Sequence, residues 1–175
     1  MSSLVFRKTE GGKAEIAQRQ AGLAPATRQL LFFSATIPRA IQDLIGAQPE
    51  ASVVWVFQPT LRKAEEFARD MAGSPRPVRV FRGRGATVEN GATEHMCPRH
   101  AAAAEIAAQG FSVKKMLCGV NDQTADGTCP HAATCAYQAQ IKALRDHHGG
   151  GVFVMTHASL LQPPPCPTPH LVIID

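Results

Sequence analysis

No stretch of this 175-residue sequence is apolar over the roughly 18 residues that a membrane-spanning helix requires. The first residues, MSSLVFRKTEGGK, become charged too early to form the apolar centre of a secretory signal peptide. Aromatic residues make up only 6% of the chain, yet 45% of its residues are hydrophobic and 18% are charged. This composition indicates a globular protein with a buried core, and we expect a cytoplasmic location without a membrane partner.

The cysteines lack the CxxC spacing from which most zinc ribbons are built. Without an export signal they do not indicate disulfides either, because the cytoplasm keeps thiols reduced. Four of the five nevertheless fall close together, with 20, 10 and 5 residues between successive members: Cys97, Cys118, Cys129 and Cys135. Proline follows the first and third of them, and we predict that these four side chains are metal ligands.

Two kinds of metal centre remain open for these thiols. Four thiolates complete the ligand shell of a cubane iron–sulfur cluster or of tetrahedral zinc, and His100 and His131 are nearby nitrogen ligands for the zinc alternative. The competing interpretation is that the cysteines are small buried hydrophobic residues. Cys166, in a proline-rich loop, is expected to be an unpaired bystander.

Apolar runs of strand length alternate with helical patterns along the chain. We expect strands in residues 28–35, 51–57, 77–81, 151–156 and 170–175, and continuous apolar runs of this kind are typical of a parallel sheet covered on both faces. The predicted fold is therefore α/β. We expect a helical N-terminal extension in residues 1–24, one α/β domain in residues 25–175, and a cysteine-bearing insert at about residues 87–148. In that insert we expect one alanine-rich helix between Cys97 and Cys118 and another from Cys129 to about His148.

The formal net charge is +4, which permits a polyanionic partner without requiring one. Between Arg62 and Arg84 the chain carries seven basic residues and three acidic ones. An ordinary solvated helix face explains this run as well as a binding surface does.

Three stretches resemble, in order, motifs of superfamily 2 DNA helicases of the iron–sulfur type. VVWVFQPTLRKAEEFARDM (residues 53–71) is similar to motif Ia, VFVMTHASLL (residues 152–161) to the segment before motif II, and LVIID (residues 171–175) to the opening of motif II, the Walker B strand. The four cysteines lie between the first and second stretches, where those helicases carry a cluster domain. The insert most resembles those of phage-type and bacterial primase–helicase proteins, and the resemblance covers residues 52–175.

The resemblance implies a RecA-like sheet, which is part of a P-loop NTPase domain 1. It also implies phosphate contacts to single-stranded or forked DNA at the Pro-Thr turn within residues 53–71, from Pro59, Thr60 and Arg62. For Thr60 and Arg62 the alternative is a helix cap and a solvated charge.

Four further basic residues would extend the positive track on the DNA: Arg82, Arg84, Lys114 and Lys115. Asp175 would be the carboxylate that holds Mg²⁺ on ATP in an intact relative. The same resemblance implies the second helicase domain or a replication protein as partner.

A P-loop, GxxxxGK[ST], is missing from the sequence. The corresponding turn would be SATIPR (residues 34–39), which has neither glycine nor lysine; SAT resembles helicase motif III, but out of order, so we interpret it as chance. We therefore expect an N-terminal helicase fragment that ends inside motif II and binds DNA without hydrolysing ATP. The alternatives are a stand-alone zinc- or iron–sulfur-binding module for nucleic acid and a remnant without activity.

We predict that the purified polypeptide shows no DNA-stimulated ATPase activity. The physical reason is that no glycine-rich loop and lysine are present to cradle the phosphates. Phosphate release measured with and without single-stranded DNA checks this, and turnover above the buffer background would contradict it.

Overall fold

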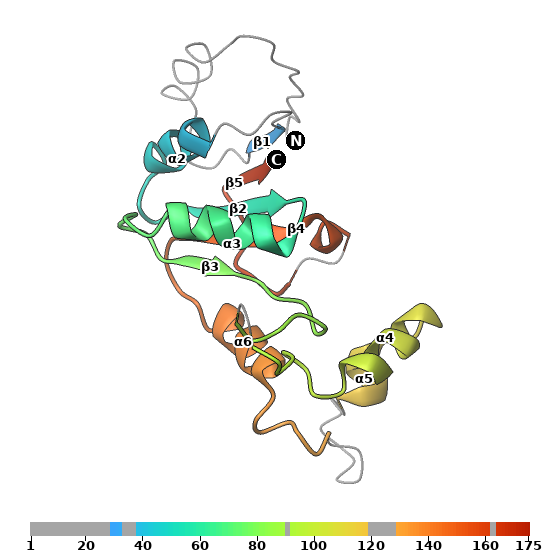
Figure 1. The fold of residues 1–175 in the computed structure, drawn as a ribbon. Helices are drawn as coiled ribbons and strands as arrows, with labels where there is room; N and C mark the ends of the chain where they lie inside the picture. Colours follow the sequence, from blue (N-terminus) through green and yellow to red (C-terminus); the bar gives the residue numbers. More distant parts are fainter. Residues whose placement is uncertain (1–28, 33–37, 90–91, 119–128, 162–163) are drawn as a thin grey trace, which may run out of the picture. The chain divides into compact units, whose positions relative to one another are not determined.

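The computed structural model describes residues 29–32, 38–89, 92–118, 129–161 and 164–175 (Figure 1). The extension expected at residues 1–24 and most of the SATIPR turn lie outside these residues. The chain divides into two compact units: the α/β unit, which contains the described residues up to Phe81 and from His147 onward, and the cysteine unit, residues 82–146. In the described part of the chain, no helix is long and apolar enough to cross a membrane.

The α/β unit is built on a five-stranded sheet in the order β1-β5-β2-β4-β3, and every pairing is parallel. This confirms the expected α/β fold with a parallel sheet. Val54 of the central strand lies level with Val152 on one side and Leu171 on the other, so apolar side chains form rows across the sheet. The strands are β1 (Gln29–Phe32), β2 (Val53–Gln58), β3 (Val78–Val80), β4 (Gly151–Thr156) and β5 (Leu171–Ile174).

Two helices supply the apolar side chains that cover one face of this sheet: α2 (Pro38–Gly46) and α3 (Leu61–Asp70). Figure 1 shows α3 lying along the sheet. Phe67 of α3 is 6% exposed, and burying such a side chain contributes about 2 kcal/mol. The core joins these residues of the helices and of β2, β4 and β5: Ile41, Leu44, Ile45, Ala64, Phe67, Met71, Val54, Val56, Val152, Val154, Leu171 and Ile173.

Side chains on the other face are held by the segments that flank β4 and β5. The indole N–H of Trp55 donates to the carbonyl of Pro167 at 3.1 Å. The ring of His147 meets that of Phe153 edge-on, with 5.2 Å between centroids. Phe153 is accordingly 1% exposed, and successive residues of β4 are buried on both faces of the sheet. A strand buried on both faces requires apolar residues at nearly every position.

Arg76 is a buried cation that ties the end of α2 to the loop before β3. Its guanidinium donates to the carbonyl of Ile45 at 2.7 Å and also to that of Gln48. Burial lowers the pKa of Arg76, while nearby Glu50 acts in the opposite direction. The carbonyl of Ile45 lies in the last turn of α2, where backbone acceptors have no partner within the helix, and Gln48 lies just after the helix.

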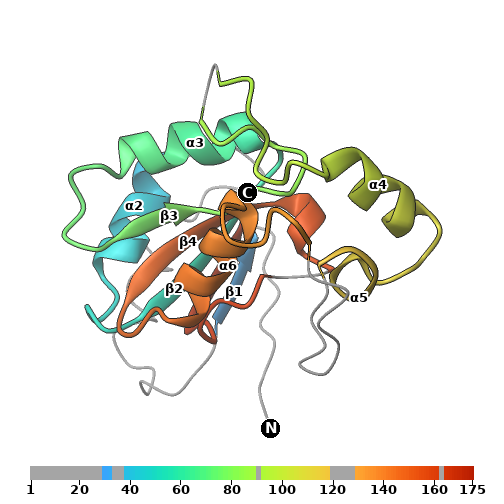
Figure 2. The ribbon, with the colours of Figure 1, turned by 90° about the horizontal axis from the view of Figure 1, so that it is seen from below.

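The cysteine unit consists of a hairpin-like segment followed by short helices. Residues 84–88 pair with residues 94–97 through backbone hydrogen bonds and a bridge between Thr87 and His95. The helices are α4 (His100–Ala108), α5 (Val113–Leu117) and α6 (Ala136–Arg145), and Figure 2 shows them from a second direction.

Both helices expected in this unit are present but shorter than expected: α4 lies between Cys97 and Cys118, and α6 lies within residues 129–148. The chain breaks between α4 and α5 at Gly110, whose φ of 78° is incompatible with a continuing helix. Residues 130–134 form turns, and α6 begins only after Cys135.

Gly150 provides a test of the α/β unit, because a Cβ there would lie 1.9 Å from the backbone oxygen of Glu50. We predict that Gly150→Ala lowers the free energy of unfolding by about 1–3 kcal/mol through this overlap. Urea unfolding followed by the fluorescence of Trp55, the single tryptophan, measures the effect in the same unit.

Gly46→Ala is the matched control, since no atom lies within 4 Å of the added Cβ and the residue ends α2. It is expected to leave the midpoint unchanged or to raise it slightly. Equal midpoints for the two variants would contradict the close approach at Gly150.

Candidate functional site

The four predicted cysteine ligands line a single cavity of about 210 Å³ within the cysteine unit. None of the described residues that line it is charged, and most of them are apolar. They are Cys97, Pro98, Leu117, Cys118, Cys129, Ala132, Cys135 and Gln138.

Each cysteine lies at the end of a structural element. Cys97 closes the hairpin-like segment, where its N–H donates to the carbonyl of Arg84 at 3.1 Å. Cys118 is the C-cap of α5, Cys135 is the N-cap of α6, and Cys129 begins the turns that precede α6. Side chains at such positions are oriented by the elements they join, so several elements position the thiols together.

Burial divides the four thiols into two pairs. Cys97 and Cys135 are 4% and 6% exposed, whereas Cys118 and Cys129 are half-buried. The thiol of Cys135 lies 3.7 Å from the carbonyl of Met96 and can donate to it. No disulfide joins them, because all four are free thiols. The sulfurs are therefore available as metal ligands, and the thiols would lose their protons on metal binding.

Four thiolates match both an iron–sulfur cluster and zinc in donor chemistry. In the described ranges, no three His, Cys, Asp or Glu side chains are close enough together to hold a metal ion. The thiols instead surround a cavity of about 210 Å³. A water molecule occupies about 30 Å³ of liquid, so this cavity has room for several atoms. All-thiolate ligation around such a space matches a cubane cluster in donor chemistry.

The two histidines considered for zinc do not line the cavity. His100 instead stacks on His95, with 3.8 Å between ring centroids, and His131 is exposed. The bystander cysteine, Cys166, belongs to the α/β unit, and burial raises the pKa of its thiol to about 12. Such a thiol is almost entirely protonated near neutral pH and is a poor ligand and nucleophile.

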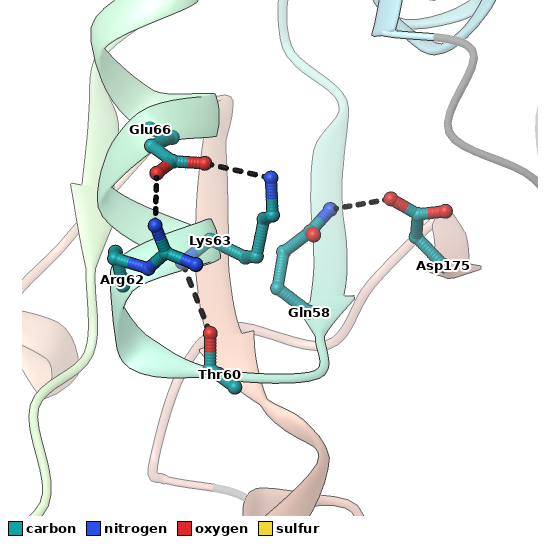
Figure 3. A network of polar contacts seen from close by, with 6 residues as sticks. All are labelled: Gln58, Thr60, Arg62, Lys63, Glu66 and Asp175. Carbon is teal, nitrogen blue, oxygen red and sulfur yellow. Dashed lines mark hydrogen bonds and ion pairs between the residues drawn. The ribbon is translucent and has the colours of Figure 1, made fainter.

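A second group of polar side chains lies at the carboxyl edge of the sheet (Figure 3). Gln58 donates to Oδ2 of Asp175 at 3.2 Å, and Nε2 of His157 lies 2.9 Å from the backbone oxygen of Asp175. The N–H of Asp175 donates to the carbonyl of Phe57 at 3.0 Å. Gln58 is 3% exposed and was missed by the sequence reasoning; its signal is a polar residue at the end of an apolar strand.

The turn after β2 presents Pro59 and Thr60 as exposed residues. Thr60 is the N-cap of α3, because its Oγ1 accepts from the N–H of Lys63 at 3.2 Å. Arg62, with 79% of its side chain exposed, lies 3.6 Å from Glu66 (Figure 3). A hydrogen bond from Lys63 lowers the pKa of Glu66, and the charge of Arg62 acts in the same direction. The helix cap and the solvated ion pair are therefore present.

The remaining basic residues have different surroundings. Lys114 and Lys115 are exposed on α5, and Arg82 bonds through its backbone to the side-chain amide of Gln140 at 3.0 and 2.9 Å. Arg84 packs its guanidinium over the ring of Tyr137 instead. Arg84 is half-buried, whereas the two lysines are exposed, and the role of these residues in binding nucleic acid stays a prediction.

Comparison with protein-family models, curated proteins and solved structures found no match to this chain. Its function is therefore argued from the chemistry of these two groups of residues.

Proposed function

We propose that this protein is a nucleic-acid-binding protein of the iron–sulfur helicase type whose cysteine unit holds a cubane iron–sulfur cluster. Its four ligands would be Cys97, Cys118, Cys129 and Cys135. The observation that carries the proposal is that these four residues, spread along the unit, line one cavity in which none of the described lining residues is charged.

The size of the cysteine unit supports a bound group. The described residues between 82 and 146 form short helices and a hairpin-like segment, and a core of that size is marginal without a metal or another cross-link. The buried apolar residues described in this unit are few: Met96, Cys97, Ala103, Leu117, Cys135 and Leu144. Two of them are themselves cysteines of the proposed ligand set. A cluster would link the hairpin-like segment, α5, the turns and α6, and it would supply one-electron chemistry when bound.

We predict that the full chain, purified without oxygen, absorbs at about 400 nm and contains iron and acid-labile sulfide. Cys97→Ser and Cys135→Ser should each reduce this absorption by more than half, because a buried thiolate ligand is lost. Absorption spectra and iron analysis provide the measurement.

Cys166→Ser is the matched control and should keep the full absorption, since its thiol lies in the other unit. Stoichiometric zinc in colourless protein would support the zinc alternative over the cluster. Protein with neither metal, or variants that keep full iron content, would contradict shared ligation by the four cysteines.

For nucleic acid, the proposal rests on the exposed side chains of residues 111–116. Phe111 is 57% and Met116 is 64% exposed, although both are large apolar residues, and Lys114 and Lys115 are exposed beside them. An aromatic ring next to cations can stack a base while the lysines contact phosphates, as in other proteins that bind single strands. Pro59, with Thr60 and Arg62, would contribute from the α/β unit.

We predict that Lys114→Glu/Lys115→Glu weakens binding of a fluorescent single-stranded oligonucleotide at least tenfold. If both lysines contact phosphates, the slope of log K against log salt should become shallower by about 1.4, since each contact accounts for about 0.7. Fluorescence anisotropy at several salt concentrations measures both quantities.

The double variant Lys142→Glu/Arg145→Glu makes the same change of charge on α6 and serves as the control. Its loss of affinity should be several-fold smaller than that of Lys114→Glu/Lys115→Glu. Equal losses of affinity for the two variants would show that only the net charge matters. If neither the natural chain nor the control binds the oligonucleotide, the nucleic-acid proposal is refuted.

The helicase part of the proposal concerns the α/β unit, which would be a partial RecA-like domain 1. The parallel sheet supports it, together with the polar group of Gln58, His157 and Asp175 at the carboxyl edge, where ligands bind in open α/β sheets. Asp175 would hold Mg²⁺ in a relative with a complete ATP site. A second helicase domain or a replication protein is the partner this proposal implies.

A further inference from the structure

Arg84 is joined to the segments that carry three of the four cysteines. Its carbonyl accepts from the N–H of Cys97 at 3.1 Å, and its Nη1 lies 3.5 Å from Sγ of Cys118. Its guanidinium carbon lies 4.0 Å from the centroid of the Tyr137 ring. Tyr137 follows Cys135 by two residues, and its own N–H donates to the carbonyl of Met96 at 2.8 Å.

The stack on Tyr137 restricts the guanidinium and keeps it beside the sulfur. A cation over an aromatic face gains about 0.5–2 kcal/mol, more where water is excluded. None of the described residues that line the cavity is charged, and Arg84 places a positive charge beside one of them, Cys118.

We infer that Arg84 is a positioning residue for the four-cysteine centre. Its guanidinium donates a hydrogen bond to the thiolate of Cys118 and raises the reduction potential of the bound cluster. This inference rests on the proposed function, because it concerns the same centre. A cluster held by four thiolates is anionic, and one-electron reduction adds a further negative charge. A fixed cation within hydrogen-bonding distance of a ligand sulfur stabilises the reduced form more than the oxidised form.

The test is a redox titration of the cluster in the full chain, with dithionite as reductant and mediators present. The absorption at about 400 nm reports the reduced fraction. At a fixed potential, Arg84→Gln should lower the ratio of reduced to oxidised cluster about tenfold, equivalent to a fall of about 59 mV for one electron. Arg84→Lys keeps the charge without the planar stack and should recover part of this difference.

Lys142→Gln removes a positive charge from an exposed position on α6 and should leave the potential unchanged. Tyr137→Phe keeps an aromatic face for the guanidinium and should leave it close to that of the natural chain. A residue that mattered only for packing would change the cluster content without changing the potential of the clusters that remain.

The outcomes separate this inference from the proposed function. If the natural chain binds no cluster, the proposed function fails and the inference fails with it. If the natural chain is loaded and Arg84→Gln has the same potential, the inference alone is overturned. If Arg84→Gln does not load but Arg84→Lys does, rescue by the conservative charge supports it. Failure of both variants to load overturns it in favour of a packing role.

Discussion

The α/β unit depends on the parallel pairing of its central strands. β2 is hydrogen-bonded to β4 over six residue pairs and to β5 over four, so it lies inside the sheet and is covered on both faces. That position requires apolar side chains at nearly every residue, and polar groups are confined to the strand ends. The same constraint places Gln58, His157 and Asp175 together, because the carboxyl ends of parallel strands meet at one edge.

The cysteine unit has no comparable framework. Its helices have nine, five and ten residues, and isolated helices of that length are marginal in water. Its described contacts include local pairings between residues 84–88 and 94–97, a few buried apolar side chains, hydrogen bonds from α6 to Arg82 and Met96, and the contacts of Arg84. A bound group on four cysteines would supply the long-range cross-links that the apolar core of this unit is too small to provide.

The elements that could be predicted are those with a strong local pattern. The apolar run at residues 51–57 predicted β2, and Thr60 was expected as a possible helix cap, which is its position at the start of α3. The helices of the cysteine unit were predicted less well. Alanine-rich sequence favours helix at every position, and the break at Gly110 depends on a backbone conformation that glycine permits but does not require.

Residue type and spacing were sufficient to predict the α/β class and the parallel sheet, because burial on both faces demands apolar side chains along the strands. Only the tertiary structure placed the four cysteines on one cavity, left His100 and His131 out of its described lining, and placed Arg84 beside Tyr137 and Cys118. These relations join residues far apart in the chain, and the distance between such residues is set by packing rather than by spacing in the sequence.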